Sequence, residues 1–328
     1  MKPIRLAVIL VLIGVSSARL RAAEVDPLLP PDTESYLSVN VRQIVDSQLF
    51  QKQLLAPAKE MLLEVGGDTV RTVLKDLGVD PFKNIDRLTI VSPKTTEADR
   101  GLIIVQGTFE ADKFRTKGEE AARLNPDSLK LHTANLGGSK QTLWEVVIPN
   151  QEASVFVGMP SNRTLLLSPG KDYVIDALKM HANRKPAPLK NKEFAALLER
   201  LDPKQSISVA VLGRSLGRAD QELVPKFLVN ALGGVEAIGG GLTVENDVRL
   251  DLLLASRDTE AAGRMHKALD KLLKGTLVGV ALLGEERREL TLVLEVLKSV
   301  KVSNRGKVVG VSGKLTQDVL EDFFKKDG

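Results

Sequence analysis

The chain has 328 residues, of which 46 are lysine or arginine, 42 are aspartate or glutamate and none is cysteine. The lack of cysteine excludes disulfides, thiolate metal sites and a lipoprotein attachment thiol, so the fold must rely on buried apolar area. The near balance of charge and an aromatic content of only 4% disfavour nucleic-acid binding, which needs a basic surface and stacking platforms.

The first residues are typical of a signal peptide. Lys2 and Arg5 precede an apolar run over residues 6–15, and small residues follow at positions 22 and 23. The run is too short to cross a bilayer comfortably, so a retained membrane anchor is the less favoured alternative. No later stretch approaches the roughly 18 uninterrupted apolar residues of a spanning helix, and we expect no transmembrane helix in the mature chain.

Residues 1–23 are therefore predicted to be the signal peptide, with the mature chain beginning between Arg19 and Glu24. This predicts an exported protein, periplasmic or extracellular. Removal of residues 1–23 takes away four basic residues and no acidic one, which leaves 42 of each kind. The basic balance of the whole chain thus belongs to the leader, and no nucleic-acid partner is expected.

Residues 24–204 are predicted to form a first α+β unit with extra strands. A proline-rich arm leads into a strand over 36–41, where Leu37 and Val39 share one face because alternate side chains of a strand point the same way. Further strands are expected over 87–92, 101–109, 129–133, 143–148, 153–158 and 164–168. Helices are expected over 42–64, 110–124, 172–182 and 192–201.

Residues 205–328 are predicted to form a second α+β unit, which starts again with an alternating strand over 206–212. The order of the following elements resembles that of the first unit. Strands are expected over 235–244, 248–256, 300–303 and 307–312. Helices are expected over 216–232, 258–273 and 277–297, with a last one around 319–324.

The two halves share an internal match. Residues 100–108 align with 248–256, so that Leu102 falls on Leu250 and Thr108 falls on Ser256. In both halves a strand leads into a hydroxyl residue, an acid suited to a helix N-terminus, and an amphipathic helix. Since each half has the order strand–helix–strand–strand–helix–strand, we predict a duplication into two tandem ferredoxin-like (βαββαβ) units with extra strands and helices and antiparallel sheets.

Some strands are apolar on both faces. Leu165, Leu166 and Leu167 are consecutive, whereas a strand with one solvated face would alternate with polar residues. We therefore expect some strands to be covered on both sides, with the other half of the chain as the cover.

A G-x-S-x-G motif spans Gly213 to Gly217, after a predicted strand and before a predicted helix. That is the context of a nucleophile elbow, and a downstream acid (Asp247, Asp251 or Asp258) and then His266 would give the serine–acid–histidine order. His266 lies in the middle of a helix among charged residues, no His-Gly-Gly oxyanion loop occurs, and the first unit has no serine at the equivalent point. We expect Ser215 to lie in a strand-to-helix turn and not to be a nucleophile.

Metal and cofactor signals are weak. The three histidines, His132, His181 and His266, are far apart and show no zinc-site spacing. The glycines at 239–241 do not fit the dinucleotide motif G-x-G-x-x-G, and a strand with a close backbone neighbour explains them. The sequence predicts no catalytic residue, no metal site and no cofactor.

The run from Leu29 to Val41, LPPDTESYLSVNV, resembles the start of the mature part of many exported bacterial proteins of unknown function. In these, a signal peptide is followed by a phrase of leucine, proline, a small residue, aspartate and threonine, and then by a first strand. The resemblance covers about the first 50 residues. It implies export and an α+β fold, and it transfers no functional residue.

Three functions are consistent with these observations. The leading hypothesis is a non-catalytic exported or cell-envelope protein that acts through binding or structural surfaces, because no cluster of histidine, cysteine or carboxylate is evident. The alternatives are a serine hydrolase that uses Ser215 and a carrier of an apolar ligand held between the two units. A protein or an apolar ligand is the expected kind of partner.

Overall fold

The computed structural model describes residues 26–61, 74–93, 100–136, 138–147, 154–183, 187–215, 235–283 and 288–325. These fall into two compact units. The N-terminal unit comprises residues 25–46 and 54–195, and the described part of the C-terminal unit is drawn from 47–53 and 196–325. The division lies close to the predicted one after residue 204, and the signal segment over 1–23 lies outside the described residues.

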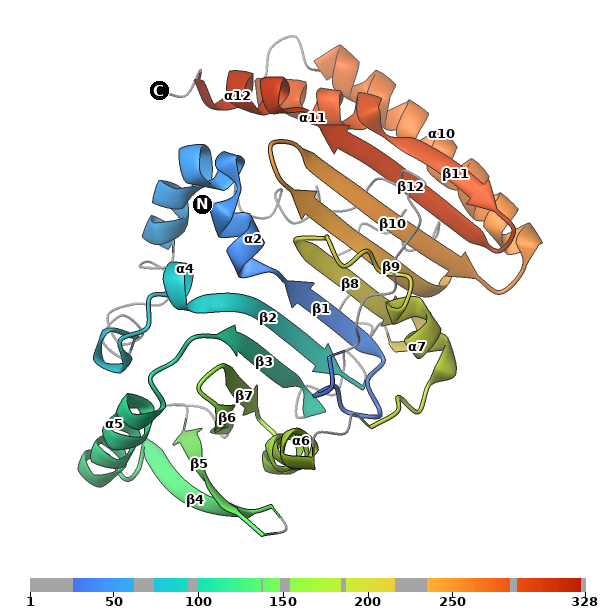
Figure 1. Cartoon of the computed structure of the whole chain (residues 1–328). Coiled ribbons are helices and arrows are strands. Elements are labelled where there is room, and N and C mark those ends of the chain that lie inside the picture. Colours follow the sequence, from blue (N-terminus) through green and yellow to red (C-terminus); the bar gives the residue numbers. More distant parts are fainter. Residues whose placement is uncertain are drawn as a thin grey trace. The chain divides into compact units, whose positions relative to one another are not determined.

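The N-terminal unit contains an antiparallel sheet of seven strands (Figure 1). Its order is β1 (Ser35–Val39), β2 (Ile85–Ser92), β3 (Leu102–Gly107), β7 (Thr164–Ser168), β6 (Ser154–Ser161), β5 (Lys140–Val147) and β4 (Leu129–Asn135). Its helices include α2 (Val41–Asp46), α4 (Pro81–Asn84), α5 (Ala111–Leu124) and α6 (Lys171–Asn183), while the π-helical turn η2 (Phe50–Leu54) and α7 (Lys192–Leu198) span the division between the units.

The described part of the C-terminal unit has five antiparallel strands. Their order is β8 (Ile207–Leu212), β9 (Val235–Val244), β10 (Val248–Ser256), β12 (Val308–Leu315) and β11 (Lys301–Arg305). A 3-10 turn, η4 (Gly213–Ser215), follows β8, and the helices are α10 (Thr259–Leu283), α11 (Arg288–Ser299) and α12 (Gln317–Lys325). One core cluster joins α10 to the sheet and consists of Leu254, Ala262, Met265, Val300, Val309 and Val311.

The mixed helix and strand composition and the antiparallel sheet are confirmed, but the strand order is not ferredoxin-like. In a split βαβ unit the strands on either side of the first helix run parallel and enclose a third strand. Here β1 pairs directly with β2 and β8 pairs directly with β9, and every pairing described within either unit is antiparallel. After a long connection the next strand can run parallel or antiparallel to the first, and the pattern of apolar residues in the two strands is the same in both arrangements.

The N-terminal sheet has one closed face and one partly open face. Leu102, Ile104 and Leu166 are fully buried on the closed face, where Val174 and Leu178 of α6 pack over Gly158 of β6. The next residues along the strands, such as Ile103 and Leu167, are only partly buried. Some strands were expected to be covered on both sides, and among the described residues the second face of β3 and β7 is only partly covered.

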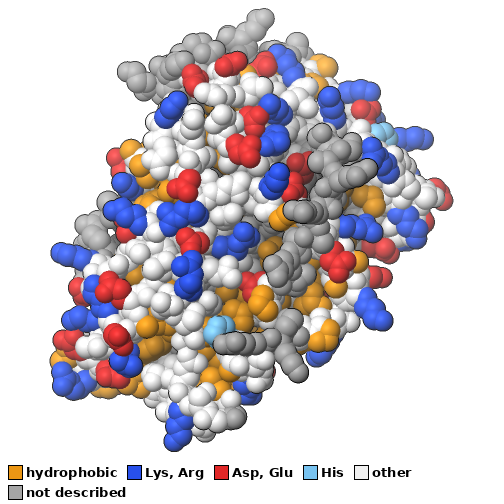
Figure 2. All heavy atoms as spheres, in the orientation of Figure 1, with side chains coloured by type: hydrophobic (Ala, Val, Ile, Leu, Met, Phe, Trp, Pro, Cys, Tyr) orange, Lys and Arg blue, Asp and Glu red, His pale blue; other side chains and the backbone are white. Residues whose placement is uncertain are grey.

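Apolar side chains on the partly open face reach the surface. Leu37 is 37% exposed and its cross-strand partner Ile90 is 38% exposed. Figure 2 shows hydrophobic side chains at the surface over the N-terminal unit, in the lower part of the view. Helix α5 covers this face beside β4 and β5, where Gly118 lies directly against Trp144. Among the described residues, no helix is both long and apolar enough to cross a membrane.

Candidate functional site

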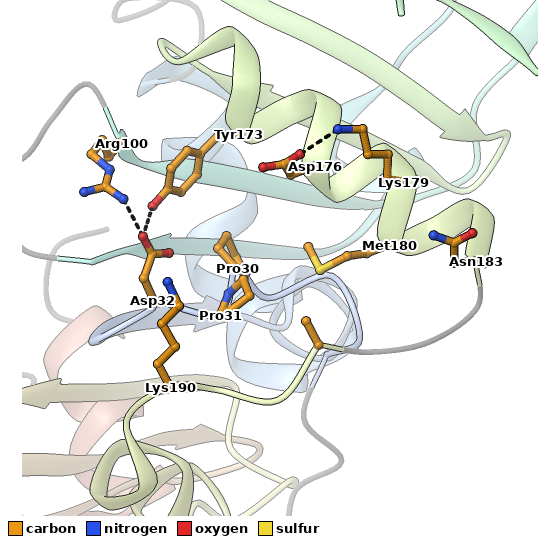
Figure 3. A pocket seen from close by; sticks show the side chains of 11 residues that line it. Pro30, Pro31, Asp32, Arg100, Tyr173, Asp176, Lys179, Met180, Asn183 and Lys190 are labelled. Carbon is orange, nitrogen blue, oxygen red and sulfur yellow. Dashed lines mark hydrogen bonds and ion pairs between the residues drawn. The ribbon is translucent and has the colours of Figure 1, made fainter. Parts of the chain in front are cut away.

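A pocket of about 770 Å³ opens in the N-terminal unit between the proline-rich arm and helix α6 (Figure 3). Its polar wall is formed by Asp32, Arg100 and Tyr173, and its apolar lining includes two proline rings and a methionine. The lining residues are Pro30, Pro31, Asp32, Arg100, Tyr173, Asp176, Lys179, Met180, Asn183, Ala187 and Lys190. Pockets of this size are common small-molecule sites.

The arm that carries Asp32 is fixed to the closed face of the sheet by Asp26. The Asp26 carboxylate accepts hydrogen bonds from the Leu28 N–H at 2.9 Å and from Gln106 Nε2 at 3.2 Å. Leu28 and Leu29 are then buried. Burial raises the pKa of Asp26 above its usual range. The hydrogen bonds of the carboxylate are therefore partly offset by the free-energy cost of removing it from water.

Two further bonds set the turn that presents Asp32. The Thr33 hydroxyl is buried and donates to the Pro30 carbonyl at 2.7 Å. The Pro31 carbonyl accepts from the Lys190 N–H at 2.7 Å, which holds residues 187–190 beside the arm. Both bonds use backbone carbonyls as acceptors, so neither of them depends on the charge of the Lys190 side chain.

Asp32 is the centre of the polar wall. Its Oδ2 accepts a hydrogen bond from the Tyr173 hydroxyl at 2.8 Å and an ion-paired bond from Arg100 Nη2 at 2.5 Å. The Arg100 guanidinium also lies over the Tyr173 ring, 5.6 Å from its centroid. Figure 3 shows the Arg100 and Tyr173 side chains converging on one carboxylate oxygen of Asp32.

The protonation state of Tyr173 decides what this wall can do. Burial, together with the hydrogen bond to the Asp32 carboxylate, raises the pKa of Tyr173 far above its usual range. The phenol therefore stays neutral and keeps its proton on the bond to Asp32. A tyrosine in this state can position a ligand or pack against it, but it does not act as a nucleophile or a general base.

A second polar cluster lies outside the pocket, on the closed face near the first residue of α6. His132 Nε2 lies 2.5 Å from Glu145 Oε2, and Lys171 Nζ lies 3.2 Å from His132 Nδ1. Because an ammonium group can only donate, Nδ1 accepts and Nε2 carries the proton toward Glu145. Ser154 donates to the other oxygen of Glu145 at 2.9 Å. These two hydrogen bonds hold the pKa of Glu145 below its usual range.

Replacing Glu145 with glutamine is expected to lower the free energy of unfolding by about 1–2 kcal/mol at pH 7, because two bonds lose their charged acceptor. The folded pKa lies below the unfolded value of about 4.3. The carboxylate's contribution is therefore complete above that value and is lost as the pH falls through the folded pKa. Urea unfolding of wild type and E145Q should show a difference at pH 7 that shrinks as the pH is lowered below about 4.

The matched control is E120Q, which removes the carboxylate of the exposed pair between Lys117 and Glu120. Exposed pairs of this kind contribute little, so E120Q should unfold like the wild type at both pH values. A loss in E145Q that stays constant with pH would contradict the assignment of Glu145 as a charged acceptor.

The predicted hydrolase residues are placed as follows. Ser215 ends the turn η4 directly after β8, and residues 216–234, with Gly217 and the predicted helix, lie outside the described residues. Gly213 has a packing explanation, because a Cβ there would overlap the Val235 carbonyl. The prediction that Ser215 is not a nucleophile stays a prediction.

Two of the downstream acids have structural partners. The carboxylate of Asp247 pairs with Lys314 at 2.6 Å, and the carboxylate of Asp258 accepts from the Ala261 N–H at 2.7 Å and caps α10. His266 lies within α10, as predicted, but it is partly buried, and among the described residues its Nδ1 has no hydrogen-bond partner. In the part of the chain that the structure describes, no group of three potential metal ligands occurs.

No protein-family model matches the chain, and no curated protein matches it. Among solved structures, crystal form I of TP0453 matches with a TM-score of 0.43 and 10% identity, covering 93% of this chain and 98% of that chain. Crystal form IV of TP0453 matches with a TM-score of 0.45 and 10% identity, covering 91% and 96%. The function therefore has to be argued from the residues of this chain.

Proposed function

We propose that the chain is an exported, non-catalytic protein that acts by binding, and that the pocket beside Asp32 receives a small molecule. The observation that carries this proposal is the polar wall, where Tyr173 and Arg100 both bond to the Asp32 carboxylate. Groups satisfied in this way shape and polarise a surface, whereas catalysis needs a nucleophile or base poised to react. The apolar lining next to this wall matches the usual make-up of a ligand site.

Export rests on the signal-peptide pattern of residues 1–23 and on the resemblance of the run from Leu29 to Val41 to exported proteins. N-terminal sequencing of the exported protein should find a start between Arg19 and Glu24. A mature chain that still begins at Met1 would speak against this part of the proposal.

The binding proposal is tested with three naphthalene probes of the same size: 2-naphthoate, 2-naphthylmethanol and 2-naphthylmethylammonium. At least one should bind the mature protein, measured by fluorescence anisotropy of the probe. The variant A187W fills part of the pocket and should weaken that binding at least tenfold. The variant A111W, which adds the same ring at an exposed position of α5 that does not line the pocket, should bind like the wild type.

Failure of all three probes to bind would contradict the binding proposal, as would binding that A187W leaves unchanged. Circular dichroism of both tryptophan variants should show that they are folded, so that weaker probe binding by A187W reflects the filled pocket and not unfolding.

We also propose that the two units are copies of one ancestral unit. The path β1-β2-β3-β7-β6 in the N-terminal unit and the path β8-β9-β10-β12-β11 in the C-terminal unit have the same neighbours and the same connections. Strands β4 and β5 are then the extra strands of the first copy. This repeated path replaces the tandem ferredoxin-like arrangement as the basis for the duplication.

The hydrogen-bonded register moves the predicted alignment by one residue. The Gly107 N–H donates to the carbonyl of Arg163, the residue before β7, and the Ser256 N–H donates to the carbonyl of Lys307, the residue before β12, both at 2.9 Å. The proposed equivalence therefore pairs Gly107 with Ser256, where the sequence alignment had paired Thr108 with Ser256. It likewise pairs Ile103 with Leu252 and separates Leu102 from Leu250.

The shifted register also brings the following helices onto equivalent faces. Helix α5 lies against Trp144, which shares the face of Ile103 through the pairings of β5, β6 and β7. Helix α10 buries Met265 with Leu254, on the face of Leu252. A shift of one residue reverses the face of every side chain in a strand, so only the shifted alignment places both helices consistently.

A further inference from the structure

The charges that line the pocket are unequal. Two of its three cations have carboxylate partners, because Arg100 pairs with Asp32 at 2.5 Å and Lys179 pairs with Asp176 at 3.0 Å. The third cation is Lys190, and among the described residues no carboxylate lies within ion-pair distance of its Nζ. The lining therefore carries one positive charge more than its acids balance.

Lys190 is held at the edge of the pocket, where its charge can attract a ligand. Its backbone N–H donates to the Pro31 carbonyl at 2.7 Å, so its Cα is fixed at the edge of the pocket. Figure 3 shows its side chain extending along the arm toward Asp32. The ammonium group is exposed to the pocket, and among the described residues it forms no ion pair with the polar wall.

The rest of the lining suits an apolar body next to the charge. Pro30 and Pro31 present ring faces, Met180 presents a flexible thioether, and the Tyr173 ring forms part of the same wall. Rings and thioethers of this kind pack well against flat apolar groups. A ligand that joins a single anionic group to such a body would meet both halves of the lining.

We propose that the pocket selects small organic anions with an apolar body, of the size of an aryl carboxylate, and that Lys190 is the residue that pairs with the anion. This inference rests on the proposed binding function and adds the ligand class to it. The fixed pair of Arg100 with Asp32 then serves as a neutral border, and Lys190 supplies the attraction. Because pairs open to solvent are weak, the selectivity is a matter of several-fold differences.

The test compares the three naphthalene probes, which share one ring system and carry charges of −1, 0 and +1. The wild-type protein should bind 2-naphthoate about three- to tenfold more tightly than 2-naphthylmethanol, and 2-naphthylmethylammonium most weakly. The preference should shrink as salt is raised from about 20 mM to about 500 mM, because screening reduces the attraction between exposed charges.

The variant K190E should reverse the order, so that 2-naphthylmethylammonium binds more tightly than 2-naphthoate. The substitution keeps the backbone bond to Pro31, so the pocket should remain formed, and unchanged binding of 2-naphthylmethanol by K190E checks this directly. K192E makes the same charge change at an exposed position of α7 outside the pocket lining and should keep the wild-type order.

The outcomes separate the two proposals. Equal binding of the three probes by the wild type, or an order that K190E leaves unchanged, would overturn the role of Lys190 while the pocket remained a binding site. Absence of binding by all three probes would contradict the binding function itself.

Discussion

Replacing Gly240 with alanine is expected to destabilise the C-terminal unit by more than about 3 kcal/mol. Gly240 lies in the middle of β9, between Val209 of β8 and Leu252 of β10. Its φ of +137° is rarely adopted by residues with a side chain, and a Cβ there would overlap the Asp251 carbonyl of the neighbouring strand. Backbone strain and overpacking each contribute about 1–3 kcal/mol, and here neither can be relieved without breaking the pairing with β10.

The control for G240A is G263A. Gly263 lies in α10 and a Cβ there meets nothing within 4 Å, so alanine should stabilise the protein by about 0.5–1 kcal/mol through its better helix propensity. Guanidinium unfolding followed by circular dichroism should move in opposite directions for the two variants. A midpoint for G240A equal to that of the wild type would show that β9 can relax around the new side chain.

The glycine run at 239–241 illustrates what the sequence could predict. It was interpreted as a strand with a close backbone neighbour, and the structure bears this out, because Cβ atoms at Gly240 and Gly241 would overlap backbone carbonyls of the two adjacent strands. The helix after β10 was also predicted, with Asp258 before it, and the Asp258 carboxylate caps α10. Such features depend on neighbours in the sequence, so local patterns can predict them.

Strand order and register could not be predicted in the same way. The alternation of apolar residues locates a strand but does not say which strand lies beside it, and the ferredoxin-like order was wrong for this reason. The alignment of Leu102 with Leu250 matched apolar residues with apolar residues. Since both faces of β3 are apolar, an alignment shifted by one residue matches almost as well, and the shifted one that we propose rests on the bonds of Gly107 and Ser256 and on the faces that α5 and α10 cover.

The candidate site was missed because its residues are far apart in the sequence. Asp32 is 68 residues from Arg100 and 141 residues from Tyr173, and no spacing pattern links them. One signal was available, since Asp32 follows two prolines in the arm before the first strand. That arm was treated as a lead-in, and the structure shows that it forms one wall of the pocket.

Truncation of Leu166 is expected to be the largest single loss in the N-terminal unit. Leu166 is fully buried on the closed face, where it pairs with Ile104 on one side and Gly158 on the other. Leucine-to-alanine changes at such positions cost about 2–5 kcal/mol, because a cavity remains in addition to the lost apolar contact. Val174 and Leu178 pack over Gly158 from α6, and a helix tied to the sheet can collapse only partly into the space.

The neighbouring variant L167A tests whether the sheet of the N-terminal unit is tightly packed on one face or on both. Leu167 has the same size and lies in the same strand, but it points to the partly open face and is only partly buried. Its loss should cost less than half as much as that of Leu166, because water already reaches part of the side chain. Urea unfolding of both variants, analysed with the same dependence of the free energy of unfolding on urea concentration, gives the two losses of stability. If L167A cost as much as L166A, the partly open face would be as tightly packed in solution as the closed one, and the consecutive leucines would then report a strand covered on both sides.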